Sequence, residues 1–173
     1  MKKLTLIISL AFLALPLFSQ NSNFRKKETL TKNLIGVWQI EKVIDKNGNE
    51  VKEITKEMKG SPLGDEIKIE ATGPKITLLA DGKYELEFNP RNIDKGNWFL
   101  ESPEILIFQL ITKKGTKSYE LLKSAAEMFE KEINYDSNGN IVENNKQKIL
   151  LSDEGKLLIN YEINYFQIYK KKK

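Results

Sequence analysis

Residues 34–45, LIGVWQIEKVID, decide the fold that this sequence predicts. Trp38, Ile40 and Ile44 fall on one face of an extended chain, and Gln39 and Glu41 fall on the other face. Lys42 is the one residue that departs from this alternation. The pattern predicts a β-strand with one buried face, followed by a turn at 45–49 whose Asn-Gly pair accepts positive φ.

Gly36 and Trp38 are predicted to form the floor of a small antiparallel barrel. An indole ring is large, and the wide apolar place for it is the closed end of the barrel, where the first strand enters. Glycine just upstream lets another backbone segment pass close by, because glycine lacks a Cβ atom. We therefore assign both residues a structural role.

The N-terminus has the pattern of an export signal. Lys2 and Lys3 precede an apolar run over 4–18, and Leu17-Phe18-Ser19 provides a cleavage site. The run of about fifteen residues is shorter than the roughly twenty needed to cross a bilayer. The predicted organisation is a signal peptide over 1–19, a flexible leader over 20–33, a barrel domain over 34–170 and a basic tail over 171–173.

Cysteine and histidine are both absent from the sequence. Without cysteine the chain cannot be a lipoprotein, and it must fold without disulfides, which favours a bacterial periplasmic or extracellular protein. Without histidine, Ser-His-Asp and Cys-His catalysis are excluded, and a metal could bind only through oxygen ligands. We expect a non-catalytic protein with no cofactor and no metal site.

The charge of the chain does not point to nucleic acid. The formal net charge of +4 includes Lys2 and Lys3, which would leave with the signal. Much of the remaining excess lies in residues 170–173, and a solvated terminus is the simplest account of these lysines. No basic stripe is interleaved with aromatic residues, so we expect no nucleic-acid partner.

The remaining sequence reads as short strands separated by turns. In the arm 83–88, Tyr84, Leu86 and Phe88 alternate with charged residues, and Ala80-Asp81-Gly82 joins this arm to 76–79 as a hairpin. Residues 51–58 are predicted as a short helix or a loop, and 118–132 as a helix. Further strands are expected at 96–100, 105–111, 148–152 and 157–169. This succession indicates an all-β barrel or sandwich.

Four segments resemble the lipocalin-like domains of exported Bacteroidota-type proteins: LIGVWQI at 34–40, ADGKYEL at 80–86, GNWFL at 96–100 and ILIF at 105–108. The resemblance implies an all-β, antiparallel up-and-down barrel of about eight strands with one or two short helices. It also implies an arginine near the last strand packed over the floor tryptophan. The two arginines, Arg25 and Arg91, lie elsewhere, so a lysine of 170–173 would take that place.

The resemblance further implies an interior that holds a small apolar or amphipathic ligand. Barrels of about eight strands are either filled by side chains or hold one small ligand, and the sequence leaves both alternatives open. The candidate cavity-lining residues are Tyr84, Leu86, Phe88, Trp98, Leu100, Leu106 and Phe108.

Two other kinds of site are weaker. Residues 45–49 and 136–140 superficially resemble calcium loops, but their glycine comes fourth rather than sixth, so hairpin turns are the better account. Glu85 and Glu87, which could act as paired carboxylates, should face solvent if Tyr84 faces inward. The main alternative to ligand binding is a cell-envelope interaction module with a filled barrel, acting through its outer surface, for instance 112–145.

Overall fold

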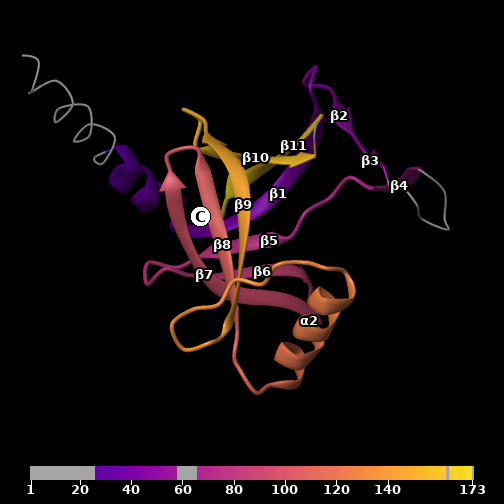
Figure 1. The fold of residues 1–173 in the computed structure, drawn as a ribbon. Helices are drawn as coiled ribbons and strands as arrows, with labels where there is room; N and C mark the ends of the chain where they lie inside the picture. Colours follow the sequence, from indigo (N-terminus) through magenta and orange to yellow (C-terminus); the bar gives the residue numbers. More distant parts are fainter. Residues whose placement is uncertain (1–25, 58–65, 163, 173) are drawn as a thin grey trace, which may run out of the picture.

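Eight antiparallel strands close into an up-and-down barrel in the computed structural model, which describes residues 26–57, 66–162 and 164–172. Each barrel strand pairs with the next along the chain, and β11 returns to pair with β1 (Figure 1). This closure confirms the predicted fold class. The predicted signal peptide, 1–19, lies outside the described residues. The barrel strands are β1 (Gly36–Asp45), β5 (Lys75–Leu78), β6 (Lys83–Asn89), β7 (Asn92–Ser102), β8 (Ile105–Thr112), β9 (Ile141–Leu151), β10 (Lys156–Glu162) and β11 (Tyr165–Lys171).

A β-bulge in β1 explains the irregular residue in its sequence. The register of β1 against β11 shifts between Ile40 and Lys42, and beyond the shift Val43 is opposite the buried Gln167. Val43 is 1% exposed, whereas Ile44 is only half-buried. The expectation that Ile44 continues the buried face was therefore wrong, because the extra residue of a bulge exchanges the two faces of a strand.

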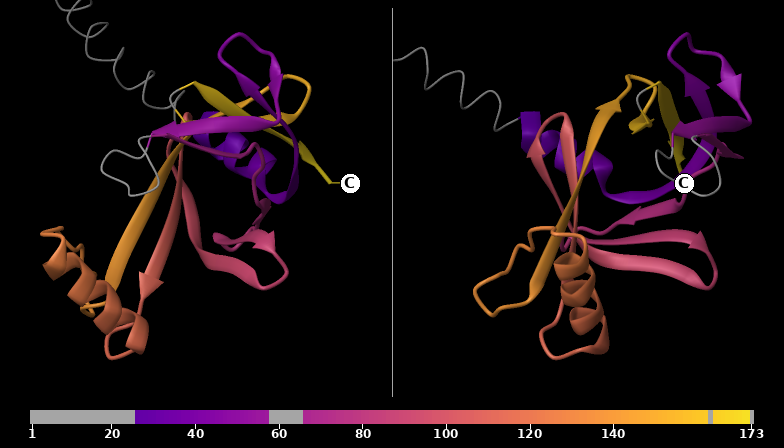
Figure 2. Two further views of the ribbon diagram at one scale, coloured as in Figure 1. Left: turned by 90° about the vertical axis from the view of Figure 1, so that its right-hand side faces the viewer. Right: turned by 45° about the vertical axis from the view of Figure 1, so that its right-hand side comes forward.

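A short helix or a loop was expected over 51–58, but the described part of this segment, residues 51–57, is mainly extended. β2 (Glu50–Val51) pairs with β1, and β3 (Glu53–Glu57) pairs with β4 (Glu66–Glu70) in a separate two-stranded sheet that projects from the barrel (Figures 1 and 2). Ile54 is buried and is opposite Ile69. Cross-strand pairing of these residues outweighs the helical spacing of their apolar side chains.

Two helices lie toward opposite ends of the barrel (Figures 1 and 2). Residues 26–34 form a helix where a flexible leader was expected, and its last residue, Leu34, is fully buried. α2 (Lys117–Met128) confirms the helix predicted over 118–132, although it ends earlier. The Thr116 hydroxyl accepts a hydrogen bond from the Tyr119 amide and caps its N-terminus.

The barrel is closed tightly at one end and opens toward α2. β10 pairs with β9 from Leu151 to Ile149, and β5 pairs with β1 from Gly36 to Trp38. The β9 residues 141–148 pair with β8 on one side but have no partner in β10 within the described part of the chain. β6 to β9 therefore diverge from β10, β11 and β1 at the α2 end, which we call the open end.

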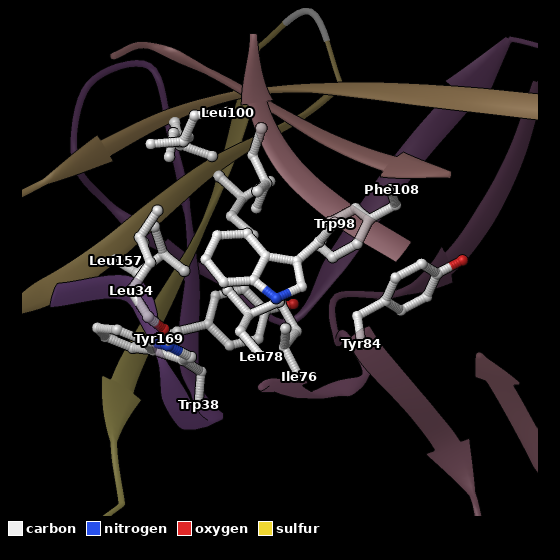
Figure 3. Packing of buried hydrophobic residues seen from close by; sticks show 13 residues of the cluster. Leu34, Trp38, Ile76, Leu78, Tyr84, Trp98, Leu100, Phe108, Leu157 and Tyr169 are labelled. Carbon is white, nitrogen blue, oxygen red and sulfur yellow. Dashed lines mark hydrogen bonds between the residues drawn. The ribbon is translucent and has the colours of Figure 1, made fainter. Parts of the chain in front are cut away.

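The hydrophobic core fills the closed end (Figure 3). Its central members come from all parts of the barrel and from the helix over 26–34. These members are Leu34, Trp38, Ile76, Leu78, Tyr84, Trp98, Leu100, Leu106, Phe108, Ile149, Leu157, Ile159 and Tyr169.

Candidate functional site

Trp38 lies at the closed end, where its surroundings are those of a structural residue. It is 1% exposed, and its Nε1 donates a 2.7 Å hydrogen bond to the carbonyl oxygen of Leu34. Lys171 Nζ lies 5.3 Å from the centre of the Trp38 ring and donates to the carbonyl of Asn33. Lys171 thus takes the place that the resemblance gave to a lysine of 170–173. Gly36 has a φ of 137°, and a Cβ there would meet the Lys171 side chain.

The deeper ligand-lining candidates are packed in the core. Trp98, Leu100, Leu106 and Phe108 are at most 5% exposed, and Trp98 Nε1 donates to the carbonyl of Leu79. A side chain that lined a ligand-sized cavity would keep part of its surface accessible to water. This part of the barrel is therefore filled by side chains, and any ligand has to bind nearer the open end.

Tyr84 marks the boundary between the filled core and the open end. Its ring is 4.9 Å from the Phe108 ring in an edge-on arrangement, and the residue is 4% exposed. Gly96 is opposite Tyr84 in the sheet, and a Cβ there would lie 2.8 Å from the Tyr84 ring, so the ring lies over this glycine. Figure 3 shows its hydroxyl directed away from Trp38 and Trp98.

The other two candidates on β6 differ in burial. Leu86 is half-buried, whereas Phe88 is 52% exposed, so the expectation that Phe88 is buried with Tyr84 was wrong. The register of β6 against β7 shifts between Glu87 and Asn89, and this bulge interrupts the alternation at Phe88.

Three further residues share the inward face with Tyr84 and Leu86. Asp94 is opposite Leu86, and Leu110 is opposite Glu143. Strand alternation places Asp94 on the face of Trp98, and Leu110 and Glu143 on the face of Phe108. Asp94 and Glu143 are exposed, and Leu110 is 38% exposed although it faces inward. We call these five residues the mouth: Tyr84, Leu86, Asp94, Leu110 and Glu143.

Asp94, Leu110 and Glu143 were missed by the sequence reasoning. A strand was expected only from residue 96, because 89–95 are mostly polar, yet β7 already begins at Asn92. The available signal was period-two spacing, from Trp98 back to Asp94 and from Phe108 on to Leu110.

Carboxylates on the two faces of the sheet have different partners. Outward-facing Glu85 and Glu87 form ion pairs with Lys95 and Lys75, as expected for solvated outer residues. Within the described residues, Asp94 and Glu143 form no ion pair. The pKa of Tyr84 is raised, first by burial and then by the negative charges of Asp94 and Glu143.

A groove of about 380 Å³ adjoins the mouth between α2 and the start of β9. Glu143 belongs both to this groove and to the mouth. The groove is mainly apolar, with Lys131 and Glu132 as its other charged residues. Its apolar lining comprises Leu122, Ala125, Ala126, Phe129, Ile133, Ile141 and Val142.

The two Asp-X-Asn-Gly-Asn segments are hairpin turns, as predicted. Asp45 Oδ1 accepts hydrogen bonds from the amides of Asn47 and Asn49, and Asp136 binds the amides of its own turn in the same way. The pKa of Asp45 is lowered mainly by the bond from the Asn49 amide, and the pKa of Asp136 mainly by a bond that the Asn140 side chain donates to its Oδ2. Among the residues described, no group of three or more acidic side chains is arranged to hold a metal ion. Within residues 26–57, 66–162 and 164–172, no helix is long and apolar enough to span a membrane.

Comparisons with known proteins give a structural likeness and no family. No protein-family model matches the sequence, and no curated protein matches it. Among solved structures, a lipocalin-like protein from Bacteroides uniformis ATCC 8492 is similar, with a TM-score of 0.37 and 13% sequence identity. The likeness covers 81% of this chain and 99% of that chain. The barrel assignment itself comes from the strand pairing of this chain.

Proposed function

We propose that this protein is exported and binds a small amphipathic molecule at the mouth of its barrel, without catalysing a reaction. The observation that carries the proposal is the accessible apolar surface of Leu86 and Leu110 on the inward face, next to a filled core. Inward-facing leucines at an open barrel end are suited to cover an apolar ligand rather than to complete the core.

The energy of such binding would come from apolar surface. Removing apolar surface from water contributes roughly 25 cal/mol per Å². The ligand would lie over Leu86 and Leu110 and continue into the groove between α2 and β9, since Glu143 joins the two regions. Export is supported by the signal-like pattern over 1–19, and a binding role by the absence of histidine and cysteine from the sequence.

The test uses the neutral fluorescent probe N-phenyl-1-naphthylamine. We expect saturable binding to the wild-type protein. Leu110→Arg should weaken it at least severalfold, because a long charged side chain would occupy the mouth. Leu150→Arg is the matched control, since Leu150 is 61% exposed and alternates with the core residue Ile149 on β9. Equal binding by both variants, or binding no better than to an inert protein, would refute the proposal.

An envelope interaction module is the second candidate. It is favoured by the filled core and by the exposure of Leu121, Met128 and Phe129, which are 62%, 76% and 66% exposed at α2. In this case the protein should sediment with purified cell envelopes, and a Leu121→Gln/Met128→Gln variant should not. Sedimentation that is unchanged by these substitutions would contradict the second candidate.

A further inference from the structure

We propose that the ligand of the mouth is a cationic amphiphile, with a protonated amino group next to an aliphatic chain. This inference rests on the proposed function and specifies the chemical class of the ligand. It is carried by the polar groups of the mouth, which come from three strands and leave negative charge without a cation.

Three side chains supply the polar part of the site. Tyr84 on β6, Asp94 on β7 and Glu143 on β9 share the inward face, and each neighbours an apolar residue of the mouth. The Tyr84 ring is held by Gly96 on one side and Phe108 on another, so its position is fixed. Its hydroxyl forms no hydrogen bond with any residue that the structure describes.

The carboxylates of the outer face have lysine partners, whereas those of the mouth do not, and this contrast indicates that the ligand carries a positive charge. On the neighbouring strands, Glu85, Glu87 and Glu101 each have a lysine across the sheet, at distances of 2.5 Å for Lys95–Glu85 and 2.7 Å for Lys146–Glu101. The inward Asp94 and Glu143 have no such lysine in the described chain. A ligand ammonium group at this position would supply the cation that the outer carboxylates obtain from the protein.

The groove gives the aliphatic chain a direction. An ammonium group between Asp94 and Glu143 leaves its chain next to Leu110 and at the entrance of the groove between α2 and β9. Lys131 and Glu132, which also line the groove, carry opposite charges, so the groove adds no net repulsion of a cation. The Tyr84 hydroxyl can accept a hydrogen bond from the ammonium group.

The experiment compares three ligands of equal chain length by displacement of N-phenyl-1-naphthylamine: dodecylammonium, dodecanol and dodecanoate, each below its micellar concentration. We expect dodecylammonium to bind at least about tenfold more tightly than dodecanoate, a difference of about 1.4 kcal/mol. Added salt should reduce this preference.

The matched variants separate the charge from the fold. Asp94→Asn/Glu143→Gln should abolish the preference for dodecylammonium over dodecanoate. Glu101→Gln on the outer face should leave both this preference and the affinity for dodecanol unchanged. If all three ligands bind equally, or if Asp94→Asn/Glu143→Gln keeps the preference, the inference is wrong while the proposed function stands. If none of them binds, the proposed function itself fails.

Discussion

Lys171 and Trp38 show how one side chain can close a barrel end. The lysine makes two interactions from one position, a cation–π contact with the indole and a hydrogen bond to the carbonyl of Asn33. It thereby links the last strand to both the first strand and the helix over 26–34. The resemblance implied a lysine from 170–173 here, but not which one, because strand register decides which lysine is opposite Trp38.

Lys171→Met should destabilise the protein by about 1 kcal/mol, since it keeps the aliphatic stem and removes the charge. Urea unfolding followed by tryptophan fluorescence measures this change. Lys171→Arg should restore most of the loss. Lys172→Met, an exposed neighbour, is the control and should have little effect. Equal stability of the two methionine variants would show that the Trp38 contact contributes nothing.

A second residue-scale feature is a buried chain of hydrogen bonds inside the barrel. The Tyr169 hydroxyl donates to Gln167 Oε1, and Gln167 Nε2 donates to the carbonyl of Thr72. Tyr169 is fully buried and Gln167 is 4% exposed. Burial raises the pKa of Tyr169 above its ordinary value of 10.0.

The raised pKa of Tyr169 predicts that the wild-type protein loses stability in alkali. This contribution to the loss should be absent from Tyr169→Phe, which has no hydroxyl at this position. Above about pH 10 the unfolded state releases the Tyr169 proton while the folded state retains it, so unfolding becomes more favourable as pH rises. The stability advantage of wild type over Tyr169→Phe should fall by up to about 1.4 kcal/mol per pH unit in this range. Denaturant unfolding between about pH 9 and pH 12 tests it.

The control for this experiment is Tyr135→Phe, because Tyr135 is 49% exposed whereas Tyr169 is fully buried. Its stability profile should run parallel to that of the wild type. A Tyr169→Phe profile that also runs parallel would contradict the assigned burial effect.

At the scale of elements, the sequence predicted those strands whose alternation is regular. The hairpin of β5 and β6 was predicted because Tyr84 and Leu86 alternate with charged residues around a glycine turn. β3 was missed because Ile54 has helical spacing to its neighbours in sequence, while its partner Ile69 is distant in sequence. The sequence predicted only the mouth residues Tyr84 and Leu86, which alternate on one strand. Asp94 and Glu143 come from other strands, and only the pairing of those strands brings them to the mouth.

The helix over 26–34 packs on the core, where a flexible leader was expected. Because the segment is mostly polar, its sequence did not predict that Leu30 and Leu34 pack on the core. Leu34→Ala should cost about 2–5 kcal/mol, as for other fully buried leucines. Leu150→Ala is the matched control and should stay within about 0.5 kcal/mol of wild type. Similar costs for both variants in urea unfolding would place the helix outside the domain.

At the scale of the whole molecule, two groups of strands share one core. β5 to β9 form one group, and β10, β11 and β1 form the other; they are joined where β9 meets β10 and where β1 meets β5. Trp38 lies on β1 and Trp98 on β7, so the two indoles report on the two groups. Because the core at the closed end contains residues of both groups, neither can unfold without exposing the other's apolar surface.

We therefore expect one cooperative unfolding transition. Tryptophan fluorescence, which reports on the shared core, and far-ultraviolet circular dichroism, which reports on the strands, should give the same midpoint in urea. A Trp38→Phe variant, which leaves Trp98 as its one tryptophan, should show the same coincidence at a lower midpoint. In a hydrogen-exchange experiment, the amides of β3, β4 and α2 should exchange before those of β8 and β11. The reason is that β3, β4 and α2 lie outside the barrel wall, whereas β8 and β11 belong to it. A fluorescence transition that precedes the loss of circular dichroism would mean that the closed end opens independently, and that the two strand groups are separate folding units.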